Sequence, residues 1–194
     1  MESTQSLANR ELAITGEPWT SPAPEAAGHQ LVQLSLPVLD ALAKQDLDTA
    51  RILSKNPAIS PYIASDACSG TWKMRADQIR ANAGDADWVT RLIVDSTGTV
   101  VGRAGFHGPP DEKGMVEVGY SVDPLHRRQG HARAALKIML DMAAKDARVK
   151  VVRASTQPIN IASRSLIDQY EFKEVGEQWD EEDGLETVLE VDMP

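Results

Sequence analysis

One stretch of the chain, residues 116–132, constrains the fold more than any other. It runs from Val-Glu-Val-Gly-Tyr-Ser-Val-Asp-Pro into a basic loop, Arg-Arg-Gln-Gly-His-Ala. Alternating apolar residues before the loop predict a β-strand, and apolar residues at helical spacing after it predict a helix. A helix start has backbone N–H groups without internal partners and carries about half a positive charge, so it binds anions, most often phosphate. The stretch therefore predicts a strand, a loop and a helix arranged around a phosphate site.

The loop has the residues that such a site needs. Arg127 and Arg128 supply fixed positive charge, and their forked donors match phosphate oxygens. Gly130 has no Cβ, so the backbone can approach a ligand closely. A single glycine excludes the Gly-x-Gly-x-x-Gly dinucleotide fingerprint, and the absence of Gly-Lys-Ser/Thr excludes a nucleotide-binding P-loop.

Composition excludes several other classes of protein. The 194 residues favour a single domain, and the net charge of −9 with a pI near 4.9 argues against a nucleic-acid partner. No apolar run reaches the roughly 18 residues that span a membrane. The single cysteine, Cys68, cannot form an internal disulfide, so we expect a reducing, cytoplasmic location. The four histidines lack metal-ligand spacing, so no metal is expected.

The rest of the chain alternates between strand and helix patterns. Helices are predicted over 36–53, with a second start at Asp48, and over 71–83, 133–145 and 160–170. Strands are predicted over 29–34, 87–94, 99–106, 115–122, 149–155, 172–178 and 185–191. Residues 95–98 fit a hairpin turn, and 56–70 and 107–114 fit loops. Residues 1–27 contain three prolines and predict an irregular or flexible arm, which leaves 28–194 as the domain.

This mixed order predicts an α+β fold, and two motifs give it a family resemblance. The loop from Arg127 to Ala132 resembles the Gln/Arg-x-x-Gly-x-Gly/Ala coenzyme A loop of the GNAT N-acetyltransferase superfamily. A second segment, Asn160-x-x-Ser163-x-x-Leu166 ending in Tyr-Glu-Phe, is similar to the family's Asn-x-x-Ala/Ser-x-x-Leu…Gly-Phe segment, with Glu171 in place of the glycine. Residues 105–110 and 117–120 resemble the RimJ/RimL-like branch.

The resemblance implies a fold and a donor site. The fold would be a central, mostly antiparallel sheet with helices on both faces, splayed at an acyl-CoA cleft where a bulge exposes the backbone of the first strand. Acetyl-CoA would be the acyl donor. Its pantetheine arm would pair with the backbone of Tyr120, Ser121 and Val122, and Asn160 and Ser163 would line the cleft. The pyrophosphate would be held by the loop residues, which are Arg127, Arg128, Gln129, Gly130, His131, Ala132 and Arg133.

Acetyl transfer also needs a base for the amine and an acid for the leaving thiolate. Glu117 is our candidate base, because strand alternation places it on one face with Gly119 and Ser121; the alternative is a strand residue paired with a basic neighbour. Tyr170 is the candidate acid, because Ile167 occupies the position where many GNAT proteins have a tyrosine. The alternative for Tyr170 is packing in the core.

The acceptor is not encoded in a motif. By resemblance it is a primary amine of a small molecule or a protein N-terminus, and a non-catalytic acyl-CoA-binding sensor or interaction module is the alternative. The acidic loop 180–184, bordered by Trp179, either attracts a cationic amine or is a solvated turn. His107, His126 and the side chain of His131 are interpreted as surface groups. Dimers are common in the family, so a homodimer is an expectation.

Overall fold

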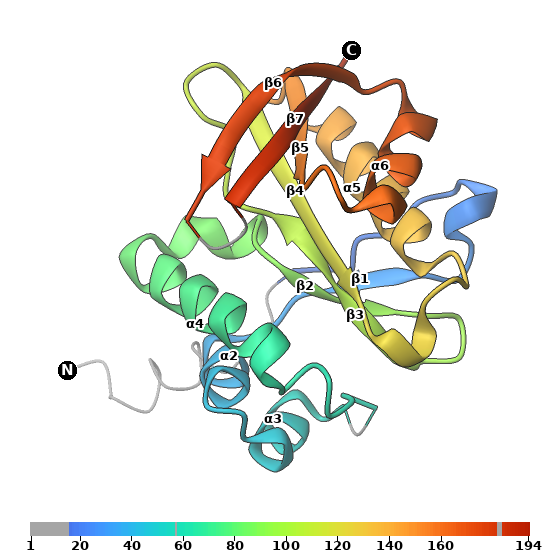
Figure 1. The fold of residues 1–194 in the computed structure, drawn as a ribbon. Helices are drawn as coiled ribbons and strands as arrows, with labels where there is room; N and C mark the ends of the chain where they lie inside the picture. The colour runs from blue at the N-terminus through green and yellow to red at the C-terminus, as the bar shows by residue number, and fades with distance from the viewer. Residues whose placement is uncertain (1–15, 57, 182–183) are drawn as a thin grey trace.

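The fold is built on one seven-stranded sheet with helices packed on it (Figure 1). The computed structural model describes residues 16–56, 58–181 and 184–194. The strand order is β1-β2-β3-β4-β5-β7-β6. The strands are β1 (Gln30–Val32), β2 (Arg91–Val94), β3 (Val100–Phe106), β4 (Met115–Val122), β5 (Val151–Thr156), β6 (Lys173–Asp180) and β7 (Gly184–Asp192). Neighbours are antiparallel except β4 and β5, which are parallel. The predicted α+β class and mostly antiparallel sheet are confirmed.

Helices cover both faces of the sheet, as expected (Figure 1). On one face α5 (His131–Lys145) and α6 (Ile161–Ile167) enclose a core with β3, β4 and β5. On the other face α2 (Leu36–Ala43), α3 (Leu47–Ser54) and α4 (Asp66–Ala81) form a second core against Leu92 and Val100 of the sheet. Four short 3₁₀ helices are η1 (Pro24–Ala26), η2 (Ala83–Asp87), η3 (Pro124–His126) and η4 (Asp168–Tyr170).

The sheet opens between β4 and β5. Their pairing runs from Met115↔Val151 to Val118↔Ala154, yet both strands continue beyond it. The splayed gap is therefore confirmed. The expected bulge in β4 is wrong, because β3 and β4 pair in continuous register over Phe106↔Val118 to Gly102↔Val122. The gap forms because the parallel pairing ends after Val118, while β4 stays straight on its other neighbour.

The predicted helix over 36–53 is two helices. Gln45 takes a left-handed backbone (φ 60°) and breaks the run, and the Asp46 side chain then accepts a hydrogen bond from the Thr49 N–H at 3.0 Å. The second helix thus starts at its Asp46 N-cap and not at Asp48. The Asp46 side-chain cap therefore sets the boundary between α2 and α3, although the hydrophobic spacing continues across it.

The predicted loop over 56–70 is wrong in its last part, because α4 begins at Asp66. Cys-Ser-Gly-Thr is a poor helix-forming sequence, but Cys68, Trp72 and Ala76 are fully buried on one helical face. The Trp72 indole N–H also donates to the Ile63 carbonyl at 2.7 Å. Burial outweighs intrinsic propensity in this segment, and the buried Cys68 packs as a core residue.

Two other local predictions differ in outcome. The strand predicted over 87–94 begins only at Arg91, since 83–87 form η2, in which Asn82 accepts from the Gly84 N–H. The hairpin turn at 95–98 is confirmed, with Gly98 at φ 84°. Among the described residues, no helix is long and apolar enough to cross a membrane.

The described part of the N-terminal arm packs on the sheet. The predicted arm covers 1–27, of which 1–15 lie outside the described residues. Trp19 forms a β-bridge with Leu31, lies 5.5 Å from the Phe106 ring and stacks under the Arg91 guanidinium. Residues 16–27 are therefore attached to the folded body, and the domain boundary at residue 28 stays a prediction.

Candidate active site

The predicted phosphate loop lies at the start of α5. Gly130 is the N-cap in a left-handed conformation (φ 88°), and no atom lies within 4 Å of where its Cβ would be. The backbone angle, and not crowding, is what requires glycine there. The first helical bond is donated by the Ala134 N–H to the Gly130 carbonyl at 2.9 Å, so three preceding N–H groups are unpaired within the helix. Those N–H groups belong to His131, Ala132 and Arg133.

The loop side chains are exposed around this helix start. Arg127, Arg128, Gln129 and Arg133 all reach solvent. Arg127 donates from Nε to the Val122 carbonyl at 3.2 Å, which ties the loop to the end of β4. Arg128 has a left-handed backbone (φ 64°), which is uncommon for a non-glycine residue. The structure brings the predicted loop residues together as one cationic helix start.

His131 is not the surface group that the sequence suggested. Its side chain is buried, and its Nδ1 lies 2.8 Å from Nε2 of His29. Burial, and then the neighbouring His29, lower the pKa of His131, and His126 acts in the same direction. Asp95 opposes the shift. Because the His131 ring is buried under the loop, only the backbone N–H of this residue is available to a ligand.

Two residues of β4 turn their backbone toward the splayed gap. The His107 N–H donates to the Glu117 carbonyl, and the Asp123 N–H donates to the Val101 carbonyl. In an antiparallel ladder, alternate residues point to opposite neighbours. Residues 117, 119, 121 and 123 therefore face β3, and the N–H and C=O groups of Tyr120 and Val122 face the gap, where β5 no longer pairs.

This alternation sets Ser121 apart from Tyr120 and Val122, the other two residues predicted to contact the pantetheine arm. Its backbone faces β3, and its Oγ lies 2.6 Å from the Tyr62 hydroxyl on the α4 side of the sheet. The Tyr120 hydroxyl instead lies 3.0 Å from the Ser163 Oγ, so the two side chains meet across the gap. Asn160 caps α6 through its bond from the Ser163 N–H, as the sequence predicted.

Glu117, the candidate base, lies one residue before the pairing of β4 and β5 ends. Its side chain is 18 % exposed, and its Oε1 accepts a hydrogen bond from the Ser155 hydroxyl at 2.6 Å. Gln178 of β6 donates to the same Ser155 and to Glu186 of β7. A chain of polar groups thus runs across β4, β5, β6 and β7 on the face opposite α5.

His107 lies at the surface, as the sequence suggested, but it also lies next to this site. Its Nδ1 lies 3.9 Å from the Glu117 Oε2, and its Nε2 lies 2.8 Å from where a Cβ on Gly119 would be. Burial lowers the pKa of His107, and the charge of Glu117 opposes that shift. The lowered pKa keeps the imidazole neutral near pH 7. A turn histidine in a proline-rich loop gives no sequence signal for this contact.

Tyr170, the candidate acid, lies away from Glu117. It packs against the core beneath α5, and burial followed by the charge of Glu25 raises its pKa. Its other charged neighbours are Arg133 and Asp141, both on α5. Ile167, one turn earlier, is fully buried in the same core. The structure brings Glu117 and Tyr170 to opposite faces of the sheet.

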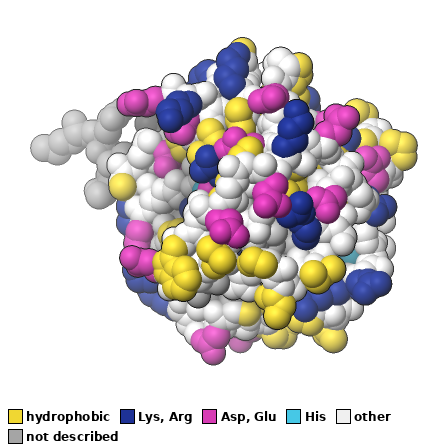
Figure 2. Space-filling model, turned by 45° about the horizontal axis from the view of Figure 1, so that its top comes forward, with side chains coloured by type: hydrophobic (Ala, Val, Ile, Leu, Met, Phe, Trp, Pro, Cys, Tyr) yellow, Lys and Arg dark blue, Asp and Glu magenta, His cyan; other side chains and the backbone are white. Residues whose placement is uncertain are grey.

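The acidic loop is the tip of the β6–β7 hairpin. Asp180 pairs with Gly184, and Trp179 beside it is 77 % exposed; residues 182 and 183 lie outside the described part of the chain. Figure 2, which turns the upper end of the molecule forward, shows acidic and basic side chains interspersed with hydrophobic ones. This face therefore does not carry a field of one sign.

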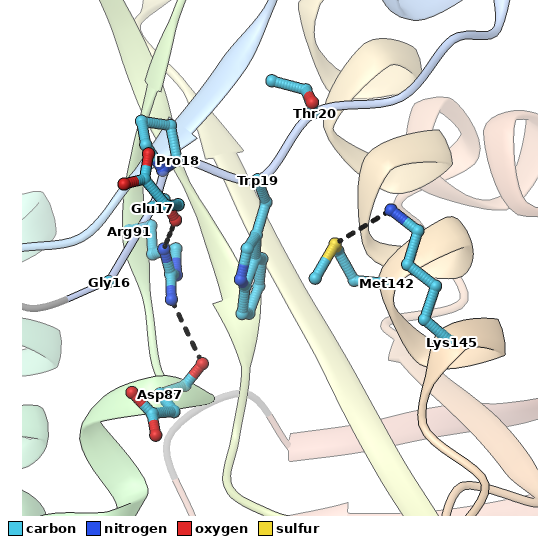
Figure 3. Close-up of a pocket in the computed structure, with 9 residues that line it drawn as sticks. All are labelled: Gly16, Glu17, Pro18, Trp19, Thr20, Asp87, Arg91, Met142 and Lys145. Atoms are coloured by element: carbon cyan, nitrogen blue, oxygen red, sulfur yellow. Dashed lines mark hydrogen bonds between the residues drawn. The ribbon is translucent and has the colours of Figure 1, made fainter.

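A shallow pocket of about 370 Å³ lies elsewhere, between the N-terminal segment and the end of α5 (Figure 3). Arg91 points into it but donates to the Glu17 and Asp87 carbonyls, both at 3.2 Å. Lys145 marks the C-terminal end of α5, a helix of 15 residues whose other end holds the phosphate loop. That separation is roughly 20 Å along the helix, so the pocket is not part of the candidate site.

Comparisons with known proteins agree with this geometry. Residues 38–173 match the model of the acetyltransferase (GNAT) domain. The chain is 26 % identical over 145 residues to the uncharacterized N-acetyltransferase YjdG of Bacillus subtilis, which covers 74 % of this chain and 84 % of that protein. The chain belongs to the GNAT family of acetyl-CoA-dependent N-acetyltransferases.

Two solved structures have the same fold. RimL, a ribosomal L7/L12 alpha-N-protein acetyltransferase in complex with coenzyme A, has a TM-score of 0.62 at 13 % identity, over 91 % of this chain and 98 % of its own. Mycobacterium smegmatis RimJ in complex with a CoA disulfide has a TM-score of 0.59 at 17 % identity, over 91 % and 86 %. The predicted family is thus confirmed by the family model, and these structures share its fold.

Proposed function

We propose that this chain transfers an acetyl group from acetyl-CoA to a primary amine of a small molecule or a protein N-terminus. One observation carries the proposal: the Glu117 carboxylate lies beside the point where β4 and β5 part, on the face opposite α5. A donor entering through the gap and an amine lying on that face would meet next to this carboxylate. Proton removal from the amine requires a base in this position, because an alkylammonium has no free electron pair.

The donor side is supported by backbone groups at the start of α5 and along the splayed gap. The helix-start N–H groups and Arg128 would hold the pyrophosphate, and the gap-facing backbone of Tyr120 and Val122 would pair with the pantetheine arm. A fixed N–H at Val122 would also stabilise the oxyanion that forms on the thioester carbonyl. When bound, acetyl-CoA supplies the activated acyl group.

The acceptor side holds the groups that move the proton. Glu117 would accept the amine proton, and the Ser155 hydroxyl would hold the carboxylate oriented. His107 offers a second acceptor next to it, because its pKa is lowered by burial. The carbonyl carbon then bonds to the amine nitrogen as the carbon–sulfur bond breaks, and the coenzyme leaves as a thiolate or thiol.

Two tyrosines are candidate donors of the proton that the thiolate takes up. Tyr170 keeps its proton, since burial raises its pKa, but its neighbours lie along α5. Tyr120 is better placed, because its hydroxyl bonds Ser163 across the gap, and burial likewise raises its pKa. A thiolate is also a good leaving group without an acid. Tyr170→Phe should therefore leave turnover intact.

A non-catalytic acyl-CoA-binding module is the second candidate function. The buried Ile167 at the usual tyrosine position favours it. Calorimetric titration with acetyl-CoA should show binding under both functions. Release of free thiol with a panel of primary amines separates them, because only the enzyme gives amine-dependent release.

Glu117→Gln provides the decisive variant. It should lower kcat by roughly 10²- to 10⁴-fold, the usual contribution of a positioned base, without changing acetyl-CoA affinity. Glu112→Gln, which removes a charge from the exposed loop before β4, is the matched control and should retain full activity. An unchanged rate and pH profile in Glu117→Gln would reject this carboxylate as the base.

A further inference from the structure

Arg103 of β3 lies on the same sheet face as Glu117. Its Cα pairs in register with Ser121, whose backbone and side chain mark the α4 side of the sheet. Its Nε is buried, and no acceptor lies within hydrogen-bond distance of this atom among the described residues.

The neighbouring arginines are different, because each has protein partners. Arg75 of α4 donates to the Thr90 hydroxyl, to Gln78 and to the His107 carbonyl. Arg153 of β5 makes an ion pair with Glu190 at 2.6 Å. Burial first, and then the positive charge of Arg103, lower the pKa of Arg75 to about 10. Arg103 is therefore a cation that lies close to another cation, and its buried Nε has no acceptor among the described residues.

Such an arrangement costs folding free energy unless something compensates it. A buried donor without a partner loses its hydration, and this loss is larger for a charged group than for a neutral one. Buried polar groups in folded proteins nearly always have a partner, so an exception calls for an explanation. Arg103 is only partly covered, so a ligand can reach it.

The surroundings indicate what kind of ligand would fit. Along this face Glu117 lies at one end, the His107 ring covers Gly119 in the middle, and Arg103 lies at the other end beside Ser121. A planar guanidinium binds carboxylate or phosphate oxygens through paired donors. The site is therefore acidic where an amine would react and basic about four strand residues away, which is roughly 13 Å between Cα atoms.

We propose that the acceptor amine carries an acidic group, a carboxylate or a phosphate, and that Arg103 binds this group while the amine lies at Glu117. This proposal rests on the proposed acetyl transfer and deepens it by naming the acceptor class.

Matched acceptors test the proposal. The first pair is a short peptide with N-terminal Glu and the same peptide with N-terminal Gln; the second is phosphoethanolamine and ethanolamine. The acidic member of at least one pair should have a KM about tenfold lower, and the pair that responds distinguishes a carboxylate from a phosphate. Arg103→Gln should remove the preference by raising KM for the acidic member alone, and Arg103→Lys should restore part of it.

Controls separate this outcome from a folding defect. Arg148→Gln removes an exposed arginine whose partner is Asp146, near the far end of α5, and should keep the preference. Equal KM values within both pairs in the unmodified protein, or an equal loss for both members in Arg103→Gln, would overturn the proposal.

Binding of the reaction products keeps the two proposals distinguishable. The N-acetylated peptides can be titrated into the protein with coenzyme A present, so that no turnover is needed. Tighter binding of the acidic product that depends on Arg103 supports the acidic subsite even where thiol release is absent and the proposed transfer fails. Equal binding of both products overturns the subsite whatever the turnover.

Discussion

Under the proposed function, the donor side and the acceptor side of this molecule would recognise their ligands by different means. The donor side would use backbone groups from one stretch, residues 120–133, together with the capped start of α6. The acceptor side would use side chains from β3, the loop after it, β4, β5 and the β6–β7 hairpin. A backbone site keeps its shape whatever the neighbouring side chains are. A side-chain site can change its ligand through single substitutions.

This difference explains how one family can keep its donor while the acceptor varies. The helix start needs only Gly130 and a few cations near it, so its motif is short and contiguous. The acceptor face needs Arg103, His107 and Glu117 to be brought together by strand pairing. Variants that affect one side and spare the other test whether the division is real.

Among the variants that test this division beyond Glu117→Gln, the largest effect is expected at Gly130. Gly130→Ala adds a Cβ where φ is 88°, at a strain of about 1–2 kcal/mol, and nothing else contacts it. If the strained loop shifts, acetyl-CoA affinity should fall roughly 5- to 30-fold, while acceptor KM at saturating donor is unchanged. Calorimetry measures the first quantity and thiol release the second.

Gly98→Ala is the matched control for this variant. Gly98 has φ 84° and equally open surroundings, but it lies in the β2–β3 turn. The Gly98→Ala protein should lose about as much stability as the Gly130→Ala protein, without any change in acetyl-CoA affinity. A loss of affinity in both variants would show that general destabilisation, and not the phosphate loop, is being measured.

The next effect is expected at Gly119, on the acceptor side. A Cβ there would lie 2.8 Å from the His107 Nε2, so the ring must leave its present position beside Glu117. Gly119→Ala should lower kcat/KM for the amine roughly 3- to 10-fold, about 0.6–1.4 kcal/mol, with unchanged acetyl-CoA affinity. Gly176→Ala, in open space on β6, should have no such effect.

A double variant tests the cause. In a His107→Ala background, Gly119→Ala should cost almost nothing more, because the clash has been removed. A full additional loss would mean that Gly119 matters for another reason, such as its pairing with Gly105, and that His107 takes no part in the acceptor side.

These two sides also differ in what the sequence could reveal. The phosphate loop and the Asn160 cap were predictable, because each depends on residues within one short segment. The splayed gap followed from the family resemblance, whereas the bulge that the resemblance implied is absent. The contact of His107 with Glu117 arises from β3–β4 pairing across the loop over residues 107–114, and no local pattern encodes it.

Arg103 shows the same limit. In the sequence it is one polar residue in an apolar strand, and only the structure shows that its Nε is buried without a partner. The start of α4 was missed for a related reason: Cys68 and Trp72 make a helix stable through burial against other segments. Sequence patterns predicted short-range features, and pairing of distant segments determined the rest.

A smaller effect concerns the histidine beneath the phosphate loop. Burial lowers the pKa of His131, so the folded protein holds it neutral while the unfolded chain binds a proton near pH 6.5. Because the unfolded state then binds more protons, the free energy of unfolding should fall as the pH drops below that value. His29, His126 and Asp95 are the charged or titratable groups that act on it.

His131→Gln should flatten this dependence. Between about pH 7.5 and about pH 5.5, the Tm of the unmodified protein should fall by a few degrees more than that of the variant, at about 2–4 °C per kcal/mol for a chain of this size. Parallel thermal melts measure the difference. Identical slopes would mean that His131 adds no proton linkage and that the donor side depends on its backbone alone.

The smallest effect is expected at Glu171, the residue that replaces the family's glycine. Its backbone is left-handed (φ 60°), which costs a non-glycine residue about 1–2 kcal/mol, partly offset by the roughly 0.5–1 kcal/mol of extra chain entropy that glycine loses on folding. Glu171→Gly should therefore raise the Tm by about 1–4 °C. Ser165→Gly, in the regular part of α6, should lower the Tm.

The acetyl-CoA affinity of Glu171→Gly tests the donor side. If the donor side depends on backbone shape and not on this side chain, that affinity should stay the same or improve. A weaker affinity would show that the Glu171 carboxylate takes part in donor binding.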